Sequence, residues 1–205
     1  PMTQNQQETP TVFIVDDDPA IRFAMQALMD SVNIEHEIYS SGDEFLESVD
    51  DHRAGCLVLD IRMPGLGGLE LQEELIKRDS TLPIIFITGH GDVPMAVDAM
   101  QKGAVDFIQK PFRDQDLLDR IREALKTDAE RREEQQKPAE VAERLDRLTN
   151  REREVFDLVV TGKPNKVIAY ELGVSQRTVE IHRARVMEKM QARSLADLVK
   201  MHMTA

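Results

Sequence analysis

Residues 57–71 read LVLDIRMPGLGGLEL, a run of aliphatic residues that ends at an aspartate and continues through a loop rich in glycine into a helical pattern. A short apolar run bounded by turn residues is typical of a strand buried on both faces of a parallel sheet. Similar runs lie on either side, and the strand candidates are TVFIV (11–15), HEIYS (36–40), CLVLD (56–60), PIIFIT (83–88) and DFIQK (106–110).

Helical patterns fill the intervals between these strands, near residues 19–32, 42–49, 68–78 and 93–102, and another begins at residue 114. Strands that alternate with helices in this way predict a parallel sheet covered by helices. Five such units predict a flavodoxin-like (βα)5 fold, in which ligands bind outside the carboxyl ends of the strands.

The rest of the chain has a wholly helical pattern. Residues 126–148 are dense in charges of both signs and contain Pro138, which predicts an exposed helix, a break and a second short helix. From Thr149 onward, amphipathic runs predict a small all-α domain. We therefore expect an α/β domain at 11–125, a charged helical linker at 126–148 and a helical domain at 149–205.

The charge is distributed unevenly along the chain. The whole sequence of 205 residues has a formal net charge of -12, which by itself argues against binding to nucleic acid. Residues 1–125 contain 10 Lys and Arg against 24 Asp and Glu, whereas residues 149–205 contain 10 against 7. A small basic domain of this kind has the electrostatic character of a DNA-binding module.

The sequence also bears on the compartment. No apolar run approaches the roughly 18 residues that a membrane span requires. The pattern of a signal peptide, a basic start followed by an apolar core, is not found either, so none is predicted. The single cysteine, Cys56, lies in the apolar run GCLVLD, so we expect it to be a core residue that forms no internal disulfide. These features predict a cytoplasmic protein without a membrane partner.

Polar side chains stand at the ends of four of the predicted strands. Asp16 and Asp17 follow the first strand, Asp60 ends the third, Thr88 ends the fourth and Lys110 ends the fifth. The carboxyl ends of parallel strands meet at one edge of the sheet, so we expect these groups to share one crevice. Three close carboxylates stay ionised only beside a cation, and Mg²⁺, or Mn²⁺ in its place, prefers such oxygen ligands.

This set of groups suits phosphoryl transfer. The carboxylate of Asp60 can attack a phosphoryl group in line, while the metal ion and Lys110 neutralise the phosphoryl oxygens and Thr88 donates a hydrogen bond. The product is an acyl phosphate. Each residue alone has an ordinary explanation, because aspartate caps helices and threonine favours strands; the coincidence of all five at one edge favours the functional interpretation.

The motifs resemble those of receiver domains. VDDDP (15–19), LVLDIRMPGLGGLEL (57–71), IFITGHGDVPMAV (85–97) and DFIQKPF (106–112) look like the acidic pair, the phosphoacceptor, the switch and the Lys-Pro segments of that family, over residues 11–125. GHGDVP together with the carboxy-terminal domain points to the FixJ branch of the NarL/FixJ family of two-component response regulators.

The resemblance implies a role for each residue of the pocket. It implies that Asp60 is phosphorylated by a sensor histidine kinase, that Asp17 and Asp60 bind the metal ion with Asp16 as a further metal-site residue, and that the carbonyl of Arg62 is another ligand. Lys110 would pair with the phosphoryl group. The chain would then be a self-phosphorylating acceptor with slow autodephosphorylation at most, and not an enzyme.

Further residues are implicated in switching. In receivers, a residue corresponding to Thr88 moves toward the phosphate as an aromatic residue, here Phe107, rotates inward. Arg62 and His90 would flank the path of the attacking water and tune the lifetime of the phosphate, although an exposed loop histidine needs no such role. Receivers of this kind commonly have a cis peptide bond before the residue that corresponds to Pro111.

The helix predicted near 93–102 suggests how phosphorylation promotes homodimerisation. Val93, Ala96, Val97 and Met100 have the spacing of one buried stripe. That assignment leaves Met95 and Ala99 on a neighbouring stripe, which we expect to be exposed beside the last strand and to complete an apolar dimer surface. The alternative is a partly buried helix that carries a few small surface hydrophobic residues.

The basic domain contains the layout of a helix-turn-helix motif. KVIAYELGVSQRTVEIHRARVMEKM (166–190) predicts a short helix, a glycine turn and a longer helix capped by Ser175. The phosphate-contacting candidates on this longer helix are Arg177, Arg183, Arg185 and Lys189. The candidates for contact with bases or the nearby backbone are Thr178, Glu180, Ile181, His182 and Ala184.

This domain resembles the LuxR-type output domain over nearly its whole length. The resemblance implies that Lys166 contacts a DNA phosphate, that promoter DNA is the target, and that RNA polymerase is a further candidate partner. Pro164 and Tyr170 replace residues that are more commonly polar in the family. The alternative is a basic helix that binds an acidic protein.

Two other classes of function fit part of the sequence. Asp16 and Asp18 form a D-x-D after the first strand, as in magnesium-dependent phosphatases of the haloacid dehalogenase type, with Asp16 as nucleophile. That family expects Thr or Val where Ala20 stands, and GDVPMAVD does not match its later acidic motif. A receiver-like domain used only as a binding surface would form no acid-labile phosphate.

Overall fold

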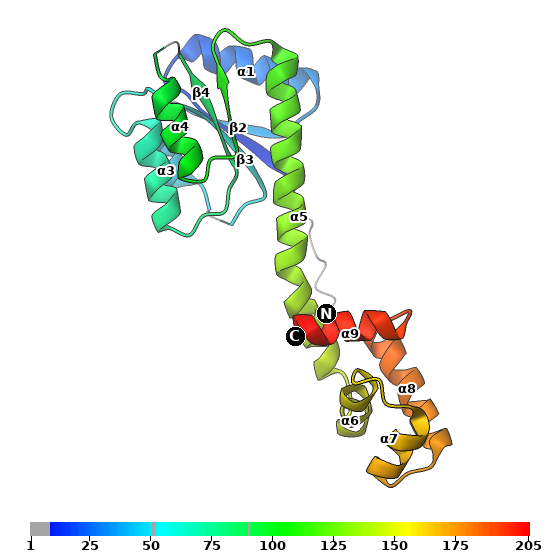
Figure 1. The fold of residues 1–205 in the computed structure, drawn as a ribbon. Coiled ribbons are helices and arrows are strands. Elements are labelled where there is room, and N and C mark those ends of the chain that lie inside the picture. Colours follow the sequence, from blue (N-terminus) through cyan, green and yellow to red (C-terminus); the bar gives the residue numbers. More distant parts are fainter. Residues whose placement is uncertain (1–8, 51, 90) are drawn as a thin grey trace. The chain divides into compact units, whose positions relative to one another are not determined.

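The computed structural model describes residues 9–50, 52–89 and 91–205, and it divides into two compact units between Arg131 and Arg132. The first unit contains a parallel sheet with strand order β2-β1-β3-β4-β5 (Figure 1). The strands are β1 (Thr11–Val15), β2 (His36–Tyr39), β3 (Gly55–Asp60), β4 (Ile84–Thr88) and β5 (Asp106–Gln109). This order is that of flavodoxin-like folds, so the predicted fold class is confirmed.

Helices connect the strands and cover both faces of the sheet. They are α1 (Pro19–Ser31), α2 (Gly42–Ser48), α3 (Gly68–Lys77), α4 (Val93–Gln101) and α5 (Asp114–Asp146). Alternate residues of β1 enter two cores: Phe13 and Val15 pack with α2, α3 and α4, while Val12 and Ile14 pack with α1 and α5. Cys56 lies in the second of these cores, where burial raises the pKa of its thiol to about 12.

The predicted buried face of α4 is wrong. Ala96 is buried as expected, but Ala99 is buried beside it, whereas Val93, Val97 and Met100 are 39%, 47% and 37% exposed. The small alanines of α4 face the core. Their size allows the backbone of α4 to approach α3, where the Ala99 carbonyl accepts a hydrogen bond from the side chain of Gln72. The predicted exposed stripe of Met95 and Ala99 is therefore wrong as well, since Ala99 is buried and Met95 is partly buried against the core, and the exposed apolar side chains of α4 are the larger ones.

The predicted helix break at Pro138 is also wrong. Pro138 lies inside the single long helix α5 (Figure 1), although a proline in a helix interior removes one hydrogen bond and costs about 3 kcal/mol. Ion pairs one turn apart on both sides of it stabilise the helix, including Lys137 with Glu134 and Arg144 with Glu140. No helix in the described ranges combines the length and the apolarity that a membrane crossing needs.

Helix α5 contributes to the packing of both units. In the first unit, Leu117 and Ile121 enter the core, and the buried carboxylate of Asp128 accepts a hydrogen bond of 2.9 Å from the amide of Gly55 at the start of β3. In the second unit, Val141 and Leu145 enter a separate helical core. Within the segment predicted as a linker, 126–148, Asp128 is therefore buried in the first unit, and Val141 and Leu145 belong to the core of the second unit.

The second unit is helical, as predicted. After the end of α5 it contains α6 (Asn150–Val159), α7 (Asn165–Leu172), α8 (Gln176–Met190) and α9 (Leu195–Thr204). A capping box of Thr149 and Glu152 begins α6, and Gly173, with a φ of 66°, makes the left-handed turn between α7 and α8. The hydroxyl of Ser175 caps α8 by accepting from the amide of Thr178.

Candidate phosphoacceptor site and DNA interface

Three carboxylates converge at the carboxyl edge of the sheet, between β1 and β3. Carboxylate oxygens of Asp16, Asp17 and Asp60 lie within 4.8 Å of one another. These strands are neighbours, with Val15 paired to Leu59, so the residues that follow them must meet. We expected this cluster because its members follow predicted strands of one parallel sheet, and the structure brings the three together.

Asp60 is held by two donors. The Lys110 ammonium lies 3.2 Å from Oδ2 of Asp60, and the backbone amide of Arg62 donates to Oδ1 at 3.0 Å. The peptide bond between Lys110 and Pro111 is cis. Helix α3 begins at Gly68 so close to the end of β3 that a Cβ at position 68 would overlap the carbonyl of Asp60. The carboxylate of Asp60 is thus oriented from two sides.

Asp16 is the most buried carboxylate of the cluster. It is 1% exposed, and burial, reinforced by the charge of Asp60, raises its pKa from 3.8 to about 6. Its Oδ1 accepts from the amide of Asp18 at 2.8 Å, whereas no donor in the described part of the chain reaches Oδ2. A buried carboxylate oxygen without a donor is a position that a cation satisfies.

A hard divalent cation fits this set of ligands. Mg²⁺ prefers oxygen ligands and is usually bound by one or two carboxylates while it keeps several waters. Asp17 and Asp60 offer accessible carboxylate oxygens, and the buried Asp16 offers Oδ2, which has no donor among the described residues. The carboxylate of Asp18, by contrast, caps α1 by accepting from the amide of Ala20, so the D-x-D pattern of the phosphatase alternative is explained by helix capping.

The expected switch residues surround this cluster. Thr88 ends β4 and is fully buried, and no partner within the described residues reaches its hydroxyl. Phe107, on the neighbouring strand β5, is partly buried against the core that α4 covers. Nε of Arg62 donates to the carboxylate of Asp92 at 2.5 Å, a pairing that the sequence analysis missed. His90 lies outside the described residues.

The longer helix of the helix-turn-helix motif, α8, presents most of the predicted DNA contacts. Its exposed members are Arg177, Glu180, Ile181, Ala184 and Arg185, and Lys166 is exposed on α7. Thr178, His182 and Arg183 are partly buried. The guanidinium of Arg183 donates to Oδ1 of Asn165 at 3.0 Å, so it fixes α8 against the start of α7. The contacts of these residues with DNA remain predictions.

Lys189 has a structural partner that the sequence did not reveal. Its ammonium lies 2.6 Å from the carboxylate of Glu152, which is only 2% exposed. Burial by itself would raise the pKa of Glu152, but the hydrogen bonds from Lys189 and Thr149 lower it overall. Lys189 therefore neutralises a buried charge at the start of α6.

Replacement of Lys189 by methionine is expected to destabilise the second unit by about 2 kcal/mol, because it leaves a buried carboxylate without its cation. The value lies below that of a fully buried pair, since the Lys189 side chain is 34% exposed. Urea denaturation measures the effect. Addition of Glu152→Gln should restore most of the stability, and Arg185→Met should change stability little; equal losses from both lysine and arginine variants contradict the assignment.

Comparisons with known proteins agree with the assignment of both units. Residues 12–122 match the response regulator receiver domain, and residues 146–202 match the luxR family of bacterial regulatory proteins. Nodulation protein W of Bradyrhizobium diazoefficiens is 49% identical over 193 residues, which cover 94% of this chain and 85% of that protein. The transcriptional regulatory protein FixJ of Azorhizobium caulinodans is 43% identical, over 97% of this chain and 94% of its own.

Two solved structures are similar to this chain over nearly its whole length. The response regulator StyR is 44% identical with a TM-score of 0.79, and the match covers 96% of this chain and 100% of that one. Full-length FixJ from B. japonicum is 39% identical with a TM-score of 0.62, over 97% and 98% of the two chains.

Fold, acidic cluster and helix-turn-helix together define a response regulator, in which a receiver domain precedes a DNA-binding domain. The chain belongs to the NarL/FixJ family of two-component response regulators. It is accordingly a regulator of transcription rather than a classical enzyme, which removes the phosphatase alternative.

Proposed function

We propose that Asp60 accepts a phosphoryl group from a sensor histidine kinase in the cytoplasm, and that the phosphorylated chain dimerises and binds promoter DNA. The observation that carries this proposal is the convergence of Asp60 with two further carboxylates, the Lys110 ammonium and the Thr88 hydroxyl, for which the described residues offer no partner. The flanking domains, 11–125 and 149–205, would act through the intervening helical segment.

In this mechanism a carboxylate oxygen of Asp60 forms a bond to phosphorus as the bond between phosphorus and the histidine nitrogen of the donor breaks. Lys110 neutralises charge on the transferred group, and Thr88 donates its hydroxyl hydrogen to a phosphoryl oxygen. Asp16, Asp17, Asp60 and the carbonyl of Arg62 would hold Mg²⁺ or Mn²⁺. The bound ion would supply charge neutralisation to the phosphoryl oxygens.

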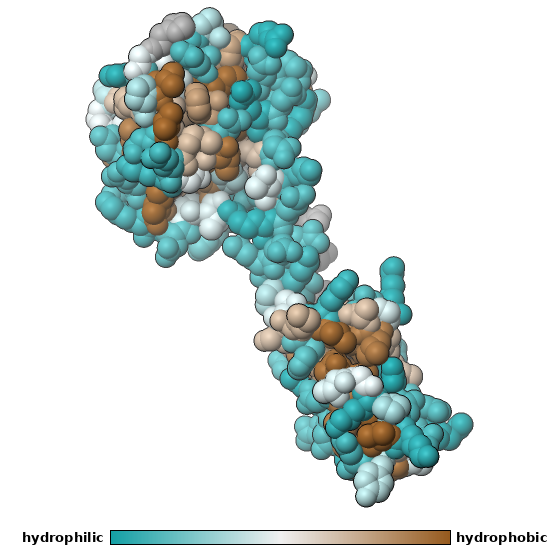
Figure 2. Space-filling view, viewed as in Figure 1, coloured by the Kyte–Doolittle hydropathy of each residue, from teal (hydrophilic) through white to brown (hydrophobic). Residues whose placement is uncertain are grey.

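The proposed dimer uses the face around α4. Val93, Val97, Met100 and Val105 are exposed there, and Figure 2 shows hydrophobic surface over α4 among hydrophilic side chains. A contiguous apolar surface with a polar rim is typical of a protein interface. Movement of Thr88 and Phe107 toward the phosphoryl group would reshape this face, because their strands β4 and β5 are neighbours beside it.

On DNA, the exposed cations Lys166, Arg177 and Arg185 would contact phosphates, while Glu180, Ile181 and Ala184 reach base edges. A dimer would place two such helices in successive major grooves of a promoter with two half-sites. RNA polymerase is a further candidate partner of the bound dimer.

Incubation with acetyl phosphate and Mg²⁺, followed by intact-mass and peptide spectrometry, tests the proposal. We expect one acid-labile phosphoryl group on residue 60 and, by sedimentation, a shift from monomer to dimer that Val97→Asp blocks. Absence of phosphate at residue 60 refutes the phosphorylation step. A dimer that forms equally well in Val97→Asp refutes the proposed interface while leaving phosphorylation intact.

A further inference from the structure

The ion pair between Arg62 and Asp92 joins the phosphoacceptor loop to the switch helix. Arg62 lies two residues after Asp60, and its backbone amide already donates to the Asp60 carboxylate. Its guanidinium Nε donates at 2.5 Å to Oδ1 of Asp92, a residue that is 7% exposed and directly precedes α4. One residue therefore contacts both the phosphoacceptor and the start of α4.

Asp92 occupies the N-cap position of α4 without capping it. Among the described residues, no amide of the first turn of α4 donates a hydrogen bond to the Asp92 side chain. The side chains of Asp18, Ser41 and Ser175, by contrast, accept from amides at the starts of α1, α2 and α8. Aspartate at an N-cap normally binds the free amides of the first turn. The Asp92 carboxylate binds Arg62 instead.

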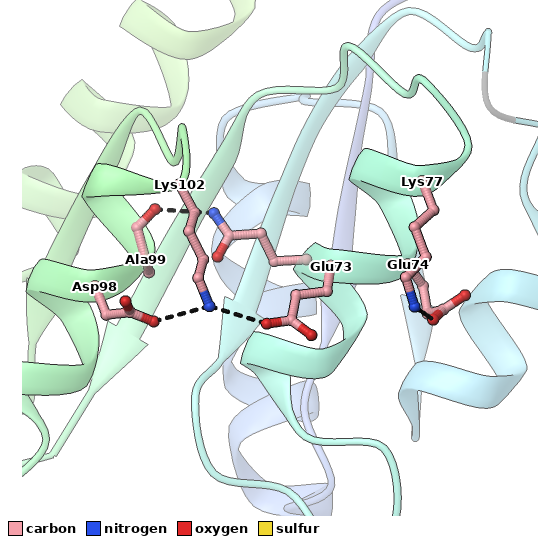
Figure 3. A network of polar contacts seen from close by, with 7 residues as sticks. Glu73, Glu74, Lys77, Asp98, Ala99 and Lys102 are labelled. Carbon is pink, nitrogen blue, oxygen red and sulfur yellow. Dashed lines mark hydrogen bonds and ion pairs between the residues drawn. The ribbon is translucent and has the colours of Figure 1, made fainter.

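The other end of α4 is fastened differently. The buried side chain of Gln72, on α3, donates to the carbonyl of Ala99 at 2.9 Å. Lys102, just after α4, lies 2.9 Å from Glu73 of α3 and 3.1 Å from Asp98 of α4 (Figure 3). These contacts do not involve the phosphoacceptor loop. A change at Asp92 can therefore alter the start of α4 while its end stays attached to α3.

We propose that Asp92 is a positioning residue for Arg62, and that a phosphoryl group on Asp60 takes the Arg62 guanidinium away from it. Once released, the Asp92 carboxylate caps α4 by accepting from the amide of Met95. This inference rests on the proposed function, since it requires phosphorylation of Asp60. The exchange would tighten the first turn of α4 beside the exposed Val93 and Val97.

The chemistry of the groups favours such an exchange. A phosphoryl group carries roughly 1.5 to 2 negative charges at neutral pH and binds guanidinium through two parallel hydrogen bonds, whereas Asp92 carries one charge. A nearly buried carboxylate that loses its cation would be costly by itself. The free amides at the start of α4 offset that cost, because they bind an anion favourably.

Beryllofluoride, which mimics the phosphoryl group on an aspartate, provides the test with the full chain and Mg²⁺. Asp92→Asn should raise the affinity for beryllofluoride about tenfold in a ¹⁹F NMR titration, since Arg62 no longer has to leave a charged partner. Asp98→Asn is the matched control, because it removes the same charge nearer the other end of α4 and should change the affinity less than about twofold.

A double-mutant cycle separates this effect from general electrostatics. On an Arg62→Gln background, which keeps the backbone carbonyl, Asp92→Asn should have almost no effect. In the wild type, beryllofluoride should also slow hydrogen exchange at the Met95 amide. If Asp92→Asn lowers the melting temperature more than Asp98→Asn does, Asp92→Ser, which retains a capping side chain, replaces it in the cycle.

The outcomes distinguish the inference from the function on which it rests. If the wild type binds no beryllofluoride and takes no phosphoryl group at residue 60, the proposed function fails. A different result is that the wild type binds the mimic while Asp92→Asn raises the affinity for beryllofluoride equally with and without Arg62, or not at all. In that case only the transfer of Arg62 from Asp92 to the phosphoryl group is refuted. Unchanged exchange at Met95 refutes the capping step.

Discussion

With Asp60 replaced by asparagine, a phosphodonor should no longer increase the affinity of the chain for its promoter. The wild type should gain about 10²- to 10⁴-fold, because dimerisation makes the second half-site contact intramolecular. Asparagine keeps the size of the side chain and still accepts from the amide of Arg62, but its amide is too weak a nucleophile to form the acyl phosphate. The loss is therefore chemical rather than structural.

Fluorescence anisotropy with promoter DNA measures this effect, with and without acetyl phosphate and Mg²⁺, at one fixed salt concentration. Glu47→Gln is the matched control, since it neutralises an exposed carboxylate on α2 and should retain the full response. Before phosphorylation, Asp60→Asn and wild type should bind DNA equally. A phosphodonor response that survives in Asp60→Asn would place the phosphoacceptor elsewhere.

The acidic pocket was predictable from the sequence because it depends only on topology. Once the apolar runs are strands of one parallel sheet, Asp16, Asp60, Thr88 and Lys110 must meet at its carboxyl edge. The helix-turn-helix was predictable for a similar reason, since Ser175 and Gly173 mark its turn locally. In both cases the signal lies in residues adjacent to the elements that they define.

Contacts between side chains distant in sequence were not predictable in this way. Arg62 and Asp92 are 30 residues apart, and Lys189 and Glu152 are 37 apart. Each of these residues also has an ordinary role as a solvated charge or a helix cap, so nothing local indicates the pairing. Lys189 illustrates the consequence, because the same positive charge suggested a DNA phosphate as its partner.

Errors of the helix predictions have a common physical origin. Hydrophobicity placed Val97 and Met100 inside, but close packing of α4 selected Ala96 and Ala99, whose small size the hydrophobic pattern undervalues. The rule that proline ends a helix likewise treats Pro138 in isolation. Packing of Val141 and Leu145 in the second core favours helix beyond that proline, and this packing is invisible in a local window.

Asp16→Asn is expected to stabilise the receiver by about 3 kcal/mol at pH 7.5 without divalent cations. Burial raises the pKa of Asp16 from 3.8 to about 6, so its charged form is disfavoured in the folded state. That penalty is fully present above about pH 6, declines as the pH falls from 6 towards 3.8, and is absent once the pH lies below the unfolded-state pKa of 3.8. The difference between these two pKa values corresponds to about 3 kcal/mol.

Urea denaturation in the presence of a chelator measures this gain, which should shrink as the pH falls from 6 towards 4 and disappear below the unfolded-state pKa of 3.8, where Asp16 is protonated in both states. Asp18→Asn is the control, since it removes an exposed charge and asparagine retains the cap of α1. Mg²⁺ should reduce the difference, because the ion stabilises each protein by RT ln(1 + [Mg²⁺]/Kd) and Asp16→Asn, which lacks one anionic group of the site, has the higher Kd. Equal stabilisation of both proteins by Mg²⁺ would exclude Asp16 from the metal site. Asp16 is thus expected both to destabilise the metal-free receiver and to strengthen its affinity for a divalent cation.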